Sequence, residues 1–472
     1  MTFIRYKLKG KKEYAYEITE YWDKNLGRSR QKSRYLGVVI DKNKKIFEKK
    51  KINILTEKII LDFGDSYTLK KFYENSETVK IIEDIFGDLQ QDFLALITYR
   101  LCYPSAMMHA NDWINGNYAT IIYPKANLTS QRISDFFKLL GDDDLQRKFF
   151  KKYLSKFSHS QNGLIIDGTS LPNQIHMPMS AWGLSGEEID KQIRFLLVVD
   201  KESSEPLYFR AVPGNIVDVS TLQTTIKELR KYDVKNNFVY MDAGFFSEDN
   251  IKEMYSNEID FLTRLPAERI VYKKLINEEA KNLESIKNFI RYGKRALFIK
   301  QKEIELFEKK AFAHIVLDPQ RKGREINRLG LNTMDEKDVN SDLEYELMTR
   351  GVMILVSSFN IPKEDIVPAY YIRQTAEKMF GFSKDDLDIL PLRVHSEEAL
   401  KGFLFLQFVS LILFVQLKKK IGKKHTVEEV LLAMRNLKCK VFDKELIICE
   451  PTKQQKELAK IFGFILPINL GI

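Results

Sequence analysis

Residues 163–170 read GLIIDGTS, residues 195–200 read FLLVVD, and residues 238–242 read FVYMD. Each holds a short apolar run, rich in aliphatic and aromatic residues, and we expect each strand to end at its aspartate, Asp167, Asp200 or Asp242, as buried strands bounded by turns do. Further strands are expected at 206–212 and 260–265, with helices at 217–232 and 247–257. The segment therefore predicts the order β-β-β-α-β-α-β.

Three strands in a meander followed by αβαβ is the order of a ribonuclease-H-like sheet, in which the first and fourth strands are neighbours. Neighbouring strands lie roughly 5 Å apart, so Asp167 and Asp242 are expected to lie close together. Carboxylate pairs of this kind suit Mg²⁺. The alternative is that both acids only begin turns. The chain has 65 acidic residues, so two of them at strand ends are expected by chance.

A second group of polar residues lies on a helix expected at Asp365–Phe380 and just beyond it. Tyr370, Arg373, Glu377 and Lys384 fall within a stripe about 60° wide at about 100° per residue. Such a face is suited to docking on a metal and a phosphate backbone together. The alternative is an ordinary surface ion pair between Arg373 and Glu377, worth a few tenths of a kcal/mol.

The rest of the chain suggests a multidomain protein, since 472 residues exceed a typical single domain. We expect a basic β-rich arm at 1–50, a mainly helical DNA-binding region at 51–160 and a catalytic core at 161–265 and 359–420. A β-rich insertion is expected at 266–358, a long buried helix at 396–417 and a helical region at 421–472.

Nearly all of the excess positive charge lies at the amino terminus. Residues 1–50 hold 15 Lys and Arg against six Asp and Glu, a balance of +9 in a chain whose net charge is +10. Two strands joined by a turn at 23–27 are expected there, and Arg28, Arg30, Lys32 and Arg34 alternate along the second strand, so they share one face. This predicts contact with a phosphate backbone, against the alternative of a solvated lysine-rich hairpin.

Several other classes of protein are disfavoured. The three cysteines, Cys102, Cys439 and Cys449, form no CxxC pair, which argues against a disulfide framework or a cysteine zinc site. There is no Walker-type GxxxxGK[ST] motif, no apolar signal core at the amino terminus and no apolar run long enough to span a membrane. We therefore expect no nucleotide cofactor and no membrane partner. Packing is favoured for Trp182 over stacking on an unpaired base.

The two strand-end acids and the polar group on the 365–380 helix resemble those of a DDE transposase of the bacterial insertion-sequence type, in the subgroup with a Tyr-Arg-Glu-Lys signature. Tyr370, Arg373, Glu377 and Lys384 match the signature position for position, while LIIDGTS and FVYMDAGFFS match the segments around the first two acids. VPGNIVD at 212–218 and YWDKNLGRSRQKSRYLG at 21–37 are also similar to family segments.

The resemblance implies that the protein binds terminal inverted repeats, cuts the DNA ends and joins the freed 3′-hydroxyl to target DNA. It implies that Asp167, Asp242 and Glu377 hold Mg²⁺ or Mn²⁺ and that Tyr370, Arg373 and Lys384 position DNA phosphates. It also implies a homodimer on paired ends, in the bacterial cytoplasm at the nucleoid. Two alternatives stay open: a ribonuclease-H-fold nuclease that cuts without joining, and a domesticated copy that only binds DNA.

Overall fold

The computed structural model describes residues 2–9, 12–23, 28–48, 57–157, 163–185, 188–216, 218–234, 238–333, 342–443 and 445–471. The chain divides into two compact units, and each is described by itself. The smaller unit comprises Met1–Ile59 with Val441–Glu445, and the larger comprises Ile60–Lys440 with Leu446–Ile472.

The smaller unit is an antiparallel sheet with the strand order β1-β2-β3-β4. Its strands are β1 (Thr2–Lys9), β2 (Lys12–Asp23), β3 (Arg28–Asp41) and β4 (Ile46–Glu48). The pairing of β3 with β4 depends on Gly37, which has a φ of +143° and at which a Cβ atom would lie 2.7 Å from the Glu48 carbonyl oxygen. The turn predicted at 23–27 lies outside the described residues except for Asp23.

The larger unit begins with β5 (Ile59–Asp62) and a group of helices. These are α1 (Gly64–Tyr73), α2 (Glu77–Phe86), α3 (Gln90–Cys102), α4 (Ala110–Asn115), α5 (Ala119–Ile122), α6 (Ser130–Leu140) and α7 (Asp143–Leu154). Asp142 ends the turn between α6 and α7 by accepting a hydrogen bond from the Leu145 amide at 2.8 Å, which caps α7. The aromatic residues of these helices supply much of the core.

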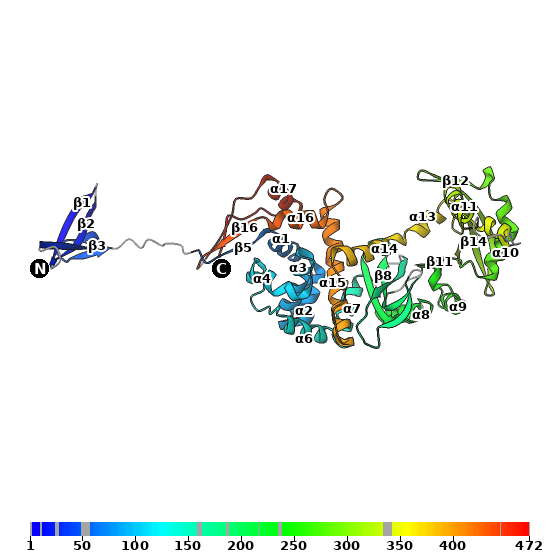
Figure 1. The fold of residues 1–472 in the computed structure, drawn as a ribbon, viewed down its shortest axis with the longest axis horizontal. Helices are drawn as coiled ribbons and strands as arrows, with labels where there is room; N and C mark the ends of the chain where they lie inside the picture. Colours follow the sequence, from blue (N-terminus) through cyan, green and yellow to red (C-terminus); the bar gives the residue numbers. More distant parts are fainter. Residues whose placement is uncertain are drawn as a thin grey trace. The chain divides into compact units, whose positions relative to one another are not determined.

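Helix α15 (Glu397–Ile421) packs against α6, α3 and β9, between the amino-terminal helices and the large sheet (Figure 1). Ser396 caps it by accepting from the Ala399 amide, and buried apolar residues surround nearly its whole circumference. Among the helices that the structure describes, α15 alone is long and apolar enough to cross a membrane, and 89% of its apolar window is buried inside the protein. It is the buried helix predicted at 396–417.

A ten-stranded mixed sheet holds the core, with the order β12-β13-β14-β15-β11-β10-β6-β8-β7 and with β9 paired to β8. The first five strands along the chain are β6 (Leu164–Pro172), β7 (Ala181–Ser185), β8 (Glu188–Asp200), β9 (Pro206–Pro213) and β10 (Phe238–Met241). Helices α8 (Asp218–Lys231) and α9 (Glu248–Ser256) make the crossovers that keep β6, β10 and β11 (Asp260–Arg264) parallel. The predicted ribonuclease-H-like mixed sheet is confirmed, with β7 as an additional strand.

The segment expected to form a β-rich insertion also carries helices, and its strands extend the core sheet. Its elements are α10 (Ile270–Glu279), β12 (Phe289–Tyr292), β13 (Arg295–Leu306), β14 (Lys309–Leu317), α11 (Pro319–Thr333), α12 (Asp342–Thr349) and β15 (Val352–Ser357). Strand β15 pairs with both β14 and β11, because its fully buried sequence VMILVS suits a position between two neighbours.

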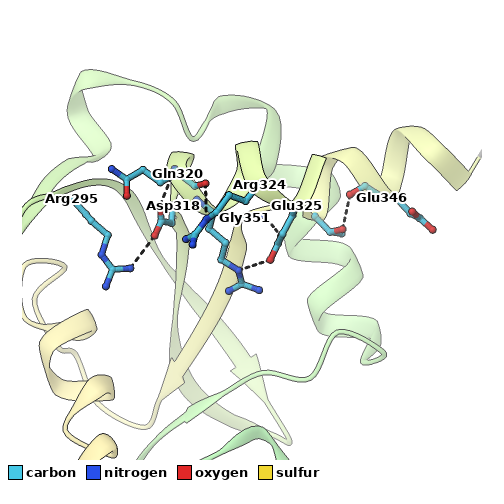
Figure 2. Close-up of polar contacts among 9 residues, drawn as sticks. Arg295, Asp318, Gln320, Arg324, Glu325, Glu346 and Gly351 are labelled. Atoms are coloured by element: carbon cyan, nitrogen blue, oxygen red, sulfur yellow. Dashed lines mark hydrogen bonds and ion pairs between the residues drawn. The ribbon is translucent and has the colours of Figure 1, made fainter. Parts of the chain in front are cut away.

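A polar cluster fixes α11 at one end of the β13–β14 hairpin (Figure 2). Asp318 accepts hydrogen bonds from the amides of Gln320 and Arg321. It also forms an ion pair with Arg295, with 3.3 Å between Oδ2 and Nη1. About two turns further along α11, Glu325 accepts a hydrogen bond from the Gly351 amide at 2.7 Å. The helix is therefore capped and tied to the start of β15 by carboxylates.

The carboxyl-terminal region was predicted as helical and is so only in part. It holds α16 (Val427–Arg435) and α17 (Lys453–Ile461), but also β16 (Lys438–Val441), β17 (Glu445–Ile448) and β18 (Asn469–Gly471). These strands form a sheet with the order β18-β17-β16-β5. Short strands of this kind gain their pairing from β5, more than 370 residues earlier in the chain, which local sequence patterns do not reveal.

Candidate active site

Two neighbouring parallel strands bring the first two acids together. Met241 on β10 pairs with Ile166 on β6, so the residues that follow, Asp242 and Asp167, lie side by side. Asp242 comes directly after its strand, as predicted. Asp167 lies inside β6, which continues to Pro172, so the prediction that it ends its strand is wrong. Pairing with β8 keeps β6 extended past the acid.

The signature residues come from two short helices instead of the single helix predicted at 365–380. Helix α13 (Ile366–Tyr371) carries Tyr370, and α14 (Gln374–Gly381) carries Glu377 in its first turn. Arg373 lies at the junction, where its amide bonds the Tyr370 carbonyl at 3.2 Å in a tighter turn. A π-helical turn, Phe382–Asp386, follows α14 and holds Lys384.

The guanidinium of Arg373 lies among all three acids. Its Nη1 atom is 2.8 Å from Asp167 Oδ2, and its Nη2 atom is 3.0 Å from Glu377 Oε1 and 3.8 Å from Asp242 Oδ1. The Tyr370 hydroxyl donates to Asp242 Oδ1 at 3.0 Å. The structure thus gathers four of the predicted residues around the guanidinium of a fifth, Arg373.

Burial and charge shape the protonation of this group. Burial, together with the charges of Asp242 and Glu377, outweighs the effect of Arg373 and raises the pKa of Asp167 to about 7. Burial opposes the charge on Arg373, but its three acidic neighbours raise the pKa of the guanidinium above its ordinary value. Burial and the nearby Asp242 charge also raise the pKa of Tyr370, so its hydroxyl keeps its proton and donates.

The acidic residues fit a divalent cation by their chemistry. Carboxylate oxygens are the ligands that Mg²⁺ prefers, and here three of them converge on a single cationic group. Among the described residues, no three acidic, histidine or cysteine side chains are placed to hold an ion directly. The guanidinium of Arg373 takes the position of a shared counter-cation, and its Nε atom is buried without a hydrogen-bond partner among the residues that the structure describes.

Lys384 joins the same face of the sheet through a residue that the sequence analysis did not single out. Its Nζ atom donates to Thr169 Oγ1 at 2.9 Å, and burial lowers the pKa of the ammonium group. Thr169 lies two residues after Asp167 on β6 and therefore shares its face. That spacing was the available signal for Thr169.

The basic residues of the arm form a surface of the smaller unit. Arg28, Arg30, Lys32 and Arg34 are all exposed on β3, opposite Asp23, Tyr21, Thr19 and Glu17 of β2. Arg34 Nη1 lies 3.9 Å from Glu17 Oε2. This ion pair is exposed and contributes little to stability. Their shared face agrees with the alternation seen in the sequence.

Trp182 is placed differently from the expectation. Packing was favoured for it, yet its side chain on β7 is 60% exposed. Its ring contacts Lys191 of β8, whose Nζ atom lies 5.7 Å from the ring centroid. The packing prediction is therefore wrong for this tryptophan.

Comparison with known proteins identifies the family of the chain. A family model described as a transposase DDE domain matches residues 158–413, which is more than half of the chain. A cryo-EM structure of a piggyBac transposase synaptic complex with hairpin DNA is similar at 9% identity, with 79% of each chain covered and a TM-score of 0.42. No curated protein matches the chain. The family match confirms the resemblance seen in the sequence, and the chain belongs to the family of transposases with a DDE domain.

Proposed function

We propose that this protein is a DNA transposase that binds the terminal inverted repeats of an insertion sequence, cleaves the DNA ends by metal-dependent hydrolysis and joins their 3′-hydroxyl groups to target DNA. One observation carries the proposal: Asp167, Asp242 and Glu377 converge on Arg373 although they come from distant parts of the chain. Bringing three carboxylates together around one buried cation costs desolvation free energy, and such arrangements cluster at functional sites.

In this proposal, Asp167, Asp242 and Glu377 hold Mg²⁺, for which Mn²⁺ substitutes. The bound metal would activate the attacking oxygen and stabilise the leaving oxygen of the phosphodiester. Tyr370 orients Asp242 through its hydroxyl hydrogen bond. Arg373 and Lys384 supply charged donors for phosphate oxygens next to the acids.

The arm residues Arg28, Arg30, Lys32 and Arg34 are proposed to contact the DNA backbone, since their exposed positive face matches a line of phosphates. We further propose that two copies act together on paired element ends, and that the protein works on bacterial chromosomal DNA in the cytoplasm. The arm, the helical region, the two parts of the core, the insertion and the carboxyl-terminal region would then correspond to the six segments predicted from the sequence.

A cleavage-and-joining assay tests the proposal. Purified protein is incubated with labelled DNA that carries the sequences flanking the gene, together with a supercoiled target, in Mg²⁺, Mn²⁺ or EDTA. We expect metal-dependent cuts and joined products that disappear in Glu377→Gln. Glu346→Gln is the matched control, because Glu346 also pairs with an arginine four residues away, at 2.9 Å from Arg350, but lies on α12.

The alternatives give different products. Cuts without joining would support a nuclease, and DNA binding without any cutting in either metal would support a non-catalytic binding protein. Normal cutting by Glu377→Gln would contradict the assignment of the acidic site. Deletion of residues 1–50 tests the arm, and unchanged affinity for the DNA ends would contradict its role.

A further inference from the structure

The feature that the proposed mechanism leaves unused is the exposed indole of Trp182 on β7. Single exposed apolar side chains are common at protein surfaces, so exposure alone carries no function. Its position relative to the acidic site is informative, because the sheet register defines which side chains share a face.

Register places Trp182 on the same face of the sheet as Asp167. Directly opposed residues of antiparallel strands point to one face, and so do alternate residues along a strand. The pairs that connect the two side chains are Asp167 with Leu197, Thr169 with Phe195, Leu171 with Ile193, and Trp182 with Lys191. The β8 members are alternate residues from 191 to 197, so a single face leads from the first acid to the indole.

Helix α14 and the π-helical turn cover the part of this face nearest the acids, and the next pair along it, Leu171 and Ile193, is buried as well. Phe380 of α14 packs against Phe195, with ring centroids 6.3 Å apart, and Lys384 reaches Thr169. Beyond them the face carries Lys191 and Trp182, and then Ile189, which is 70% exposed. Six residues separate Leu197 from Lys191, which corresponds to about 20 Å along the strand.

We propose that Trp182 stacks on an unpaired base of the DNA strand bound at the acidic site. The inference rests on the proposed function, because it takes that strand as its ligand. An indole stacks on any base, since every base has a π-face. Lys191 lies against the ring, where a cation is favoured, and its charge suits the phosphate next to the stacked base.

Duplex DNA is a poorer ligand for this surface, because its base faces are already stacked on one another. At the 3.4 Å per nucleotide of B-form DNA, the 20 Å separation corresponds to about six nucleotides from the phosphate at the acids, and to fewer in an unpaired, more extended strand. Trp182 therefore marks a place where the strand is opened close to the cut.

The test compares two DNA probes in EDTA, so that no cutting occurs. One is a plain duplex, and the other is the same duplex with an unpaired tail of about eight thymidines, which exceeds the six nucleotides of the separation. Affinity is measured by fluorescence anisotropy for the full chain. The wild type is expected to bind the tailed probe about 10-fold more tightly than the duplex, a typical contribution of one stacked base.

Trp182→Ala should lose this preference while its affinity for the duplex stays unchanged, and Trp182→Phe should retain most of it. The melting temperature of Trp182→Ala should match the wild type, since the side chain is exposed. A 2-aminopurine in the tail should show quenched fluorescence on binding to the wild type and not to Trp182→Ala.

Two results would overturn the inference: no preference for the tail in the wild type, or a preference that Trp182→Ala keeps. Failure of the proposed function looks different, since the wild type would then bind neither probe or Glu377→Gln would still cut DNA. If Glu377→Gln abolishes cutting while Trp182→Ala keeps the preference, only the stacking inference is wrong.

Discussion

Helices α6 and α15 approach each other so closely that only glycine fits at the crossing. A Cβ atom at Gly402 would lie 1.8 Å from the Phe137 carbonyl oxygen and 2.9 Å from the Gly141 amide nitrogen. Both neighbours are backbone atoms, so they cannot move aside by changing a rotamer. The substitution Gly402→Ala should therefore force the two helices apart.

The magnitude follows from two opposing effects. Overpacking a tight core with one methyl group costs about 1–3 kcal/mol, and an approach of this kind against backbone belongs at the upper end. Replacing glycine by alanine inside a helix stabilises the helix by about 1 kcal/mol. We expect a net loss of about 2 kcal/mol. The larger unit has about 400 residues, so its entropy of unfolding is about 0.9 kcal/mol/K and the melting temperature should fall by about 2 °C.

A second glycine in a helix provides the control. Gly323 lies in α11 and is exposed. Outside its chain neighbours and its own helix backbone, no atom of the described residues lies within 4 Å of the position that a Cβ would take. Gly323→Ala should stabilise the protein by about 0.5–1 kcal/mol. Thermal unfolding followed by circular dichroism measures both variants. An unchanged or raised melting temperature for Gly402→Ala would refute the close-packing argument.

Three further predictions concern the insertion, a buried histidine and the site lysine. Asp318→Ala should destabilise the protein by about 1–2 kcal/mol in urea unfolding, because it removes the cap of α11, whereas Asp318→Asn should lose less. His314 is buried, its Nε2 atom bonds the Ile361 carbonyl at 2.9 Å, and burial lowers the pKa of its imidazole. The unfolded chain therefore binds the proton more readily than the folded protein. The free energy of unfolding should fall as the pH drops below about 6.5, by at most about 1.4 kcal/mol per pH unit. That slope should be smaller in His314→Gln, and an identical slope would contradict the assignment. Lys384→Met should weaken DNA binding and reduce the salt dependence of log K by about one phosphate contact, while the exposed Lys273→Met on α10 should leave both unchanged.

Much of the site could be predicted because its residues follow local rules. The acids Asp167 and Asp242 belong to apolar runs whose strand character is visible in the residues themselves. Tyr370, Arg373 and Glu377 share a stripe at helical spacing, and they meet in the structure even though the helix is interrupted at Arg373. The interruption leaves the three side chains on one side, since a tighter turn changes their angular positions only modestly.

Other features escaped prediction because they depend on contacts between distant segments. The insertion was expected as a separate β-rich segment, yet β15 enters the core sheet beside β11. The carboxyl-terminal strands form because β5, far away in the sequence, shares their sheet. Trp182 was expected to pack, and no local pattern indicated that the face beyond Ile193 stays open.

The sequence by itself indicated the succession of strands and helices in the core, apart from β7. It also placed Asp167 and Asp242 in apolar runs, set Tyr370, Arg373 and Glu377 on one stripe, and concentrated the positive charge in the first 50 residues. These properties follow from side-chain periodicity and composition, which are local. Only the tertiary structure decided that Arg373 lies among the three carboxylates, that Lys384 reaches Thr169 and that Trp182 shares their face. The physical reason is that hydrogen bonds, ion pairs and sheet register join residues separated by many positions, and these depend on how the whole chain packs.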